Sequence, residues 1–406
     1  MRISFLCTFE PHTAGGILTM GRARGAQLNG YSVHVVFQPF KTDRYVGKST
    51  GRGYSAPLSQ IGKTTLPVTR VYSRFFSGGL LQRLFLLPKF LLIDFPRAFL
   101  PLYRSECVVI HKPLPLSFFY MVCLRLFRYR GTICCVHSDW EGVGGYADIT
   151  SPGNISRKML VTFCEEVSPR LCDVVWCASR TLYTRFGLSG KISDKCMYLS
   201  CGGESFQSAG KKFNGNPRTV IYSGSYKSRQ TVDFLTGVAR HTCRESAQFR
   251  FVFLGTGPFL AELQERVAQE VGSERVECPG HVGHAEVIEY LGKSHFALLY
   301  LNGKYPETYT EMSRSSTKLF EYLCAGTIVV ASDFGEAREL LGGTDAACLE
   351  PNDPALFAGR LVLLDRMAAG DLTRISNAAI ELFRTRFSHQ VQMKELLEFA
   401  HSKRKK

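Results

Sequence analysis

The sequence predicts an α/β protein built from two doubly wound parallel-sheet domains. At 406 residues the chain is too long for one ordinary core, and it fits two domains of roughly 200 residues. Short, buried-type apolar runs alternate with helical stretches, and the alternation starts again after a polar, glycine-bearing stretch at residues 203–218. Since strands that alternate with helices pair in parallel and are covered on both faces, each half predicts one such sheet.

The first half opens on the apolar run "RISFLC" and continues as strands separated by helices. Each predicted strand is a short run rich in β-branched and apolar residues, namely residues 2–7, 31–37, 107–112, 131–138, 173–179 and 195–203. The helices expected between them are residues 17–30, 116–130 and 180–188.

The second half repeats this plan. Its predicted strands are residues 219–225, 249–257, 276–282, 296–301, 327–332 and 346–350. Its predicted helices are residues 231–245, 259–272, 285–294 and 317–325, followed by long helices to the end. We therefore expect domains at 1–203 and 204–385, with a terminal helix at 386–406 that packs back toward the first domain and carries a basic tail. Ligands of such sheets lie beyond the carboxyl ends of the strands, so a cleft between two facing sheets is the expected site.

Composition indicates a soluble globular protein, with 45% apolar and 21% charged residues. The first residues contain only a five-residue apolar run, too short for a signal peptide, and no run is long enough for a transmembrane helix. The fourteen cysteines form no C-x-x-C pair and mostly lie in apolar runs, which predicts buried, reduced thiols in a cytosolic protein. The net charge of +15 favours an anionic partner.

The stretch "SSTKLFEYLCAGTIVVAS" predicts a helix that runs through a glycine into a buried strand. Apolar side chains form one stripe of this helix, while Lys318 and Glu321 share the other face. Ser315, Ser316 and Thr317 are suited to cap its start, where unpaired N–H groups form an anion site fit for a diphosphate. A carboxylate one turn further in can accept hydrogen bonds from a ribose diol. The alternative is a capped core helix with two solvated charges.

The segment "KLFEYLCAGTIVVASDFGEARELL" resembles the donor-nucleotide segment of the retaining family-4 glycosyltransferases. The segments "GGILTMGRARGAQLNGYSVHVV", "VIYSGSYKSRQTVDFLTGVAR", "FVFLGTGP" and "VECPGHVGHAEVIEYLGKSHFALL" are similar to other parts of that family, in the same order. The resemblance spans nearly the whole chain. It implies the GT-B fold, in which two Rossmann-like domains face a central cleft. It also implies transfer of a sugar from a nucleotide-diphosphate donor, with no metal or other cofactor.

The resemblance also implies site residues. Those implied to bind the donor are Gly15, Gly16, Gly224, Ser316, Thr317, Lys318 and Glu321. Many members carry two glutamates with seven residues between them. Glu321 matches the second, whereas Ser313 stands at the first, and Glu311 or Glu307 lies nearby at the wrong spacing. Lys227 and Arg229 are the candidates for the basic pair that clamps the diphosphate, although either could be an ordinary surface residue.

In the first domain, "CCVHSDWEGVGG" places His137 and Asp139 just after a buried strand. We expect Asp139 to be catalytic, because a carboxylate after a strand end seldom serves a core. His137 is a second catalytic candidate, with a structural histidine as its alternative. Gly15 and Gly16 allow close approach of backbone to a phosphate or sugar, and a simple tight turn is the alternative.

The predicted activity is therefore retaining transfer of a sugar to a glycan, lipid-linked or other acceptor. A nucleotide-sugar epimerase of similar architecture and a non-catalytic nucleic-acid-binding or scaffold protein are the alternatives. "LGTGPF" and "TAGGIL" do not complete a dinucleotide fingerprint, which disfavours a dehydrogenase. The donor base, the sugar and the acceptor cannot be read from the sequence, and no nucleic-acid partner is expected.

Residues 70–130 combine ten basic side chains with only two acidic ones and an apolar background. We expect this region to dock on an anionic membrane from the cytoplasmic side, with Arg74, Arg83 and Lys89 among its cations and residues such as Phe75, Phe76 and Leu84–Leu87 inserted. The alternative is that the apolar residues simply cover the parallel sheet.

Overall fold

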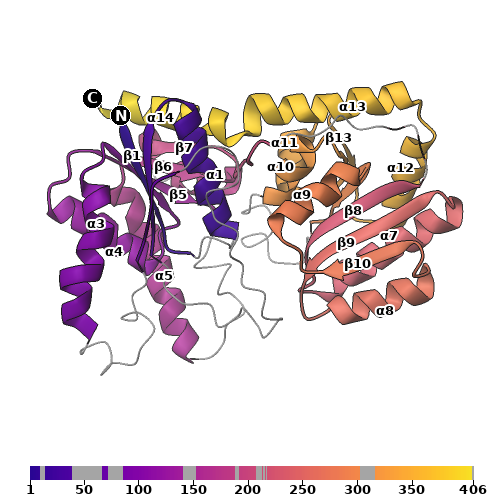
Figure 1. Ribbon diagram of the computed structural model, residues 1–406, viewed down its shortest axis with the longest axis horizontal. Coiled ribbons are helices and arrows are strands. Elements are labelled where there is room, and N and C mark those ends of the chain that lie inside the picture. Colours follow the sequence, from indigo (N-terminus) through magenta and orange to yellow (C-terminus); the bar gives the residue numbers. More distant parts are fainter. Residues whose placement is uncertain are drawn as a thin grey trace. The chain divides into compact units, whose positions relative to one another are not determined.

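The computed structural model describes residues 1–9, 14–38, 66–71, 86–139, 152–187, 192–206, 213, 215, 217–301 and 316–404. The chain divides into two compact units. Met1–Glu204 and the terminal segment His389–Lys406 form the first unit, and Ser205–Ser388 forms the second (Figure 1). Each unit is a parallel sheet with helices on both faces, which confirms the predicted fold class of two doubly wound α/β domains.

The first unit contains a seven-stranded sheet in the order β3-β2-β1-β4-β5-β6-β7, with every neighbouring pair parallel. Its strands are β1 (Arg2–Cys7), β2 (Ser32–Phe37), β3 (Val68–Arg70), β4 (Cys107–His111), β5 (Thr132–His137), β6 (Val174–Cys177) and β7 (Cys196–Tyr198). The strand β3 was not predicted, because three residues at a sheet edge give no readable alternation.

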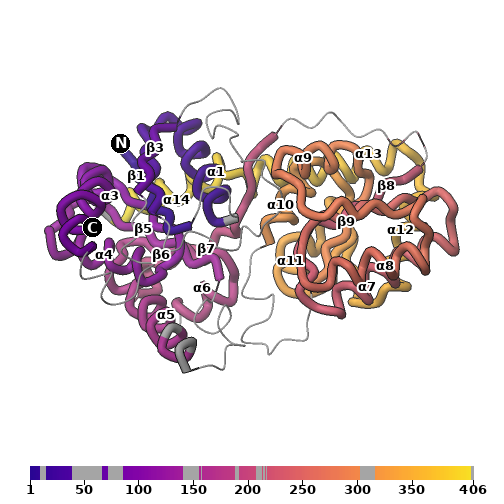
Figure 2. Tube along the Cα trace, turned by 60° about the horizontal axis from the view of Figure 1, so that its bottom comes forward, coloured from indigo at the N-terminus to yellow at the C-terminus, as the bar shows by residue number. Residues whose placement is uncertain are grey.

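Two helical layers cover this sheet (Figure 2). Its helical segments are α1 (Ala14–Leu28), η2 (Phe90–Asp94), α3 (Phe95–Tyr103), α4 (Pro115–Leu126), α5 (Pro152–Leu171), α6 (Arg180–Gly187), η4 (Ser193–Lys195) and α14 (His389–Arg404). One buried cluster joins the sheet to α1 and α14, and another joins the opposite face to α3, α4 and α6. The terminal helix α14 thus completes the core of the first unit, although the chain reaches it only after the second.

The second unit contains a six-stranded sheet in the order β10-β9-β8-β11-β12-β13. Its strands are β8 (Arg218–Ser225), β9 (Phe249–Thr256), β10 (Val276–Gly280), β11 (Phe296–Leu299), β12 (Ile328–Ser332) and β13 (Ala347–Glu350). Its helical segments are α7 (Arg229–Glu245), α8 (Leu260–Glu270), α9 (His284–Lys293), α10 (Thr317–Cys324), α11 (Gly335–Leu341), α12 (Pro354–Asp365), α13 (Ala369–Leu382) and η6 (Phe383–Phe387).

Both sheets grow outward in two directions from their first strand. In the first unit β1 lies between β2 and β4, and in the second β8 lies between β9 and β11. Such a reversal opens a crevice at the carboxyl ends of the central strands, where ligands of doubly wound sheets bind. These two edges are therefore where the predicted site residues must be sought.

The structure also describes the cysteines and the suitability of the helices to cross a membrane. All fourteen cysteines are unpaired. Eleven are buried, as predicted, and Cys243, Cys278 and Cys348 are partly buried. Within the described part of the chain, the helices lack the combination of length and apolarity needed to cross a bilayer. Residues Arg74, Phe75, Phe76, Arg83 and Leu84, named for membrane contact, lie outside the described residues, as do Glu307, Glu311 and Ser313.

Candidate functional site

The carboxyl ends of β8 and β9 meet with no room for a side chain. Gly255 has φ +131°, and a Cβ on it would lie 1.6 Å from the carbonyl oxygen of its strand partner Gly224. Only glycine tolerates both this conformation and this contact. Gly224 and the following Ser225 are partly open to solvent, so the edge presents bare backbone beside the reversal point of the sheet.

Helix α10 begins at Thr317 and packs Leu319, Phe320 and Leu323 into the core, which confirms the predicted helix and its apolar stripe. Gly326, with φ +66°, ends it before β12. Lys318 and Glu321 remain half-exposed on the other side. Both the helix and its polar face therefore lie where the sequence pattern predicts them.

The start of α10 differs from the expectation. Ser316 makes no side-chain capping bond; instead its backbone N–H donates to Oε2 of Glu336, at 2.7 Å. Glu336 is buried at the beginning of α11, and a carboxylate at a helix N-terminus is stabilised by the helix dipole. The N–H of Ser316 is thus already bonded within the protein. The N–H groups of Thr317 and Lys318 are therefore the candidates for binding a diphosphate.

Two contacts hold α10 against the end of β8. The Lys318 Nζ lies 4.7 Å from the ring centroid of Tyr222, a cation–π distance. The backbone N–H of Ser223 donates to the hydroxyl oxygen of Tyr322 at 2.9 Å. Tyr322 is fully buried, so this bond is fixed. Lys318 is thereby brought beside Gly224, although they are far apart in the sequence.

Glu321 has a partner that the sequence reading did not identify. His284, the first residue of α9, lies with Nε2 3.0 Å from Glu321 Oε1. The hydrogen bond with Glu321 raises the pKa of His284, against the opposing effect of burial. The only available signal was a histidine at a helix start just after a strand end. His284 therefore holds one carboxylate oxygen and leaves the other available.

Loss of the His284 bond is expected to be visible in a pH titration. The pKa of His284 is raised in the folded state, so its contribution to stability is complete below its ordinary value of 6.5 and disappears as pH rises through the folded-state pKa. Wild-type protein should lose stability across that window, and His284→Gln should not show this loss. Thermal unfolding of both proteins between mildly acidic and mildly alkaline pH measures the difference. Parallel curves would show that the imidazolium contributes nothing.

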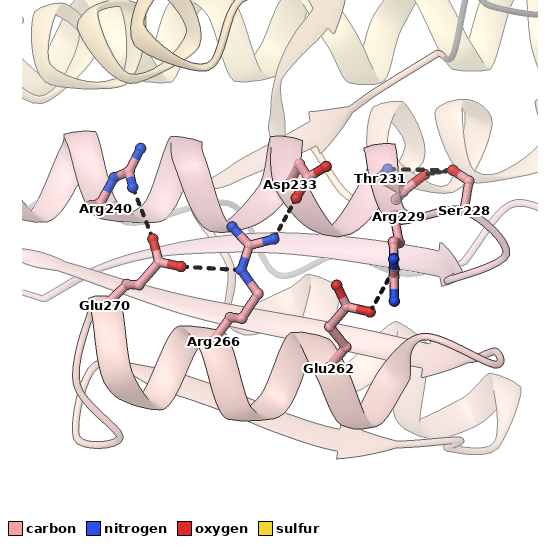
Figure 3. A network of polar contacts seen from close by, with 8 residues as sticks. All are labelled: Ser228, Arg229, Thr231, Asp233, Arg240, Glu262, Arg266 and Glu270. Atoms are coloured by element: carbon pink, nitrogen blue, oxygen red, sulfur yellow. Dashed lines mark hydrogen bonds and ion pairs between the residues drawn. The ribbon is translucent and has the colours of Figure 1, made fainter.

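The structure separates Lys227 from Arg229. Arg229 is the first residue of α7, and its guanidinium Nε lies 3.2 Å from Glu262 Oε2 on α8, with the side chain 73% exposed (Figure 3). It belongs to a row of ion pairs between these two helices that also includes Arg240 with Glu270 (Figure 3). Lys227 is exposed at the end of β8 and has no ion pair among the described residues. Lys227 is thus the cation of the two that is available to a ligand.

At the edge of the first sheet, Asp139 follows β5 and Lys112 follows β4. The Lys112 Nζ lies 2.5 Å from Asp139 Oδ2, and both side chains are partly open to solvent. Lys112 has φ +61°, a left-handed conformation that is uncommon for a residue other than glycine. Such strain is often found at functional sites. The pair therefore presents an anchored carboxylate at the reversal point of this sheet.

His137 differs from Asp139 in its exposure. Its side chain is fully buried, with its ring 4.7 Å from that of Phe186, and burial lowers its pKa to about 3. The imidazole is neutral, and Nε2 lies 3.3 Å from Ser168 Oγ. This environment is that of a structural histidine, and only Asp139 of the two reaches solvent.

Gly15 and Gly16 lie in the first turn of α1 instead of in a loop before it. A Cβ on Gly15 would lie 3.0 Å from the ring of Phe9 and 3.3 Å from Nε2 of His111. A side chain at position 15 would therefore be crowded by Phe9 and His111, beside the β1–β4 reversal. His111 is buried, and burial together with Arg22 lowers its pKa well below the usual range.

The predicted residues thus form two groups, one at the reversal point of each sheet. Gly224, Lys227, Lys318 and Glu321 gather in the second unit, and Gly15, Lys112 and Asp139 in the first. In the described part of the chain no three metal-ligating side chains come together. The second group combines cations, helix N–H groups and an oriented carboxylate, a set suited to a nucleoside diphosphate.

Comparison with known sequences gives one family. The family model for glycosyl transferases group 1 matches residues 217–365. A curated relative, the phosphatidylinositol N-acetylglucosaminyltransferase gpi3 subunit of Schizosaccharomyces pombe, is 22% identical over 249 residues, which are 60% of this chain and 51% of that protein. The chain spans about half the length of this relative.

Solved structures share the fold over nearly the whole chain. The sucrose-phosphate synthase (tll1590) of Thermosynechococcus elongatus has a TM-score of 0.64 at 16% identity, covering 99% of both chains. Anabaena Alr3699/HepE, solved in complex with UDP, has a TM-score of 0.65 at 15% identity, covering 99% of this chain and 100% of that one. Likeness at this identity demonstrates the common fold.

Proposed function

We propose that the chain, whose residues 217–365 match the family model for glycosyl transferases group 1 and which shares its fold with known glycosyltransferases, is a retaining glycosyltransferase of that family. Its proposed donor is a nucleotide-diphosphate sugar. The observation that carries the proposal is the group at the β8 edge, where Lys318 of α10 lies over the ring of Tyr222, close to Gly224, and Glu321 follows on the same helix. A helix N-terminus, two cations and a half-exposed carboxylate match the diphosphate and the ribose of one ligand.

Glu321 is assigned to the ribose. His284 holds its Oε1, so the remaining oxygen can accept from vicinal hydroxyl groups. Lys227 and Lys318 are assigned to the diphosphate, together with the N–H groups of Thr317 and Lys318. UDP is the nucleotide we propose, because the fold relative HepE was solved with UDP bound.

The transfer step balances without a cofactor. The bond between the donor sugar's anomeric carbon and the phosphate oxygen breaks, and a bond from the acceptor hydroxyl oxygen to the same carbon forms on the same face. The acceptor proton passes to the leaving phosphate oxygen, while Lys227 and Lys318 stabilise the charge that develops on the diphosphate. Asp139, anchored by Lys112, is assigned to the sugar or acceptor.

The acceptor we propose is a lipid-linked or membrane-proximal hydroxyl compound. The supporting observation is the name of the curated relative, an N-acetylglucosaminyltransferase for phosphatidylinositol. We propose that the protein works at the cytoplasmic face of a membrane. Its fourteen unpaired cysteines are consistent with a reducing compartment.

The cations provide the first test, with a matched pair of variants. Lys227→Ala should lower turnover about tenfold, because it removes one charge that stabilises the leaving diphosphate, and it should change donor affinity less. Arg229→Ala removes an equal charge two residues away but one that is paired with Glu262, so its turnover should change little. Release of nucleoside diphosphate from a panel of sugar nucleotides measures both. Equal losses in the two variants would refute the assignment of Lys227, and no release from any donor would refute the activity.

A further inference from the structure

The segment that contains η2 and α3, together with the helices α4 and α5, exposes an unusual number of apolar side chains. Of the eighteen exposed large apolar residues in the described part of the chain, thirteen lie between Leu87 and Phe163. This set, which we call the α3–α5 face, includes Leu91, Leu92, Ile93, Leu100, Tyr103, Phe119, Leu126, Phe127, Met159, Leu160 and Phe163. Leu92 is 77% and Leu126 75% exposed, so these are not the edges of core residues.

The helices on the other face of the same sheet show that the fold does not require exposed apolar side chains. Helix α14 covers the opposite face, and its inward positions, such as Met393 and Leu396, are buried. Its exposed positions are polar or charged, namely Gln390, Lys394, Glu395, Glu398, His401 and Ser402. A helix can therefore cover this sheet with its outward side polar. The α3–α5 face does not follow that pattern, and covering the sheet does not explain it.

The exposed residues belong to one connected surface. The rings of Phe95 and Phe119 lie 5.7 Å apart and join α3 to α4. Phe118 and Phe163 lie 5.8 Å apart and join α4 to α5. The ring of Phe127, just after α4, lies 5.4 Å from that of Phe99 in α3. Figure 1 shows the three helices side by side along one side of the sheet.

Four exposed arginines flank this face, whereas the acidic side chains near it, Glu106, Glu166 and Asp173, are each paired with a cation of the protein. Arg97 and Arg104 are exposed on and just after α3, and Arg128 and Arg130 are exposed just after α4. For these four arginines the described residues provide no ion pair. The acidic residue of η2, Asp94, is buried. Apolar and aromatic side chains flanked by unpaired cations match a bilayer interface, in which acyl chains lie under anionic headgroups.

We propose that the α3–α5 face docks on an anionic lipid surface, with η2 and the ends of α3 and α4 entering the headgroup region. The inference deepens the proposed function, since it supplies the partner that presents a lipid acceptor. The docking itself requires neither donor nor transfer. Residues 72–85 lie outside the described residues, whereas the side chains of the α3–α5 face are described and can be changed one by one.

Sedimentation with vesicles tests the docking. Wild-type protein should bind vesicles of phosphatidylcholine with phosphatidylserine about tenfold more than pure phosphatidylcholine vesicles, and high salt should reduce this binding. The double variant Leu92→Glu with Leu126→Glu should remain in the supernatant. Its matched control, Leu356→Glu with Leu363→Glu, changes two exposed leucines of α12 and should bind like wild type.

A second pair of variants isolates the charge. Arg97→Glu with Arg104→Glu should abolish the preference for phosphatidylserine, whereas Arg244→Glu with Arg250→Glu, at exposed positions of the second unit, should keep it. UDP binding by all these variants should equal that of wild type, so a failure of docking is distinguishable from a failure of the proposed activity. Wild-type protein that stays in the supernatant at low salt would overturn the proposal. So would equal losses in face and control variants, or a dimer that Leu92→Glu dissociates in the absence of vesicle binding.

Discussion

Asp139→Asn should lower sugar transfer by a hundredfold or more, roughly the scale seen when one preorganised electrostatic group is removed from an active site. The change keeps the size of the side chain and removes the charge that Lys112 anchors at 2.5 Å. Binding of UDP should be unchanged, because Asp139 lies in the first unit and the donor nucleotide is assigned to the second. Transfer kinetics and a UDP titration on the same preparation measure the two effects.

Two further variants, one of the ion-pair partner and one matched control, accompany Asp139→Asn. Lys112→Met should reproduce most of the loss if the ion pair sets the position of the carboxylate. Asp345→Asn changes an exposed carboxylate that is also paired with an arginine, Arg374, and should leave transfer unchanged. A partly exposed pair contributes about 1 kcal/mol or less to stability, so all three variants should stay folded. Normal transfer by Asp139→Asn would remove this residue from the site.

Glu321→Ala should weaken UDP binding by about 1.5–3 kcal/mol, the range for hydrogen bonds to a charged group, or roughly tenfold to a hundredfold. The side chain is half-exposed and the helix keeps its buried stripe, so folding should be little affected. Isothermal titration with UDP provides the measurement. Glu289→Ala, at an exposed position of α9, is the control.

The bond between His284 and Glu321 makes these two residues dependent on each other. If His284 acts by orienting the carboxylate, His284→Ala should weaken UDP binding in the wild-type background. The same change should have no further effect on UDP binding in the Glu321→Ala background. Additive losses would mean that His284 contacts the nucleotide independently. Unchanged UDP affinity in Glu321→Ala would exclude the ribose assignment altogether.

The sequence predicted the fold because most of its strands are short β-branched runs and its helices have apolar stripes. The segment after Ser316 shows how well this works, since helix, glycine and strand all lie where the pattern placed them. Two of the missed elements have weak or short patterns. Helix α5 combines polar and apolar residues without a clear stripe, and β3 has only three residues. Weak or short patterns leave no signal to read.

Contacts at the candidate site can be anticipated from the sequence where one segment supplies several groups, and they are missed where distant segments meet. Lys318 and Glu321 share a helix, so their spacing shows that they share a face. His284 and Glu336 reach α10 from other elements, and no local pattern reports that contact. The same holds for Lys112, which reaches Asp139 across two neighbouring strand ends. Burial separates His137 from Asp139, although the two are adjacent in the same motif.

The most direct measurement follows a sugar label from donor to lipid. The protein is incubated with sugar-labelled UDP-N-acetylglucosamine or UDP-glucose and vesicles that contain phosphatidylinositol, and the lipid fraction, the UDP and the remaining sugar are analysed. Our account predicts that one donor gives label in the lipid, with one UDP released per sugar transferred and the anomeric configuration retained. Asp139→Asn should abolish the transfer. UDP release with the label left as free or epimerised sugar, or no reaction with any donor and acceptor of the panel, would contradict it.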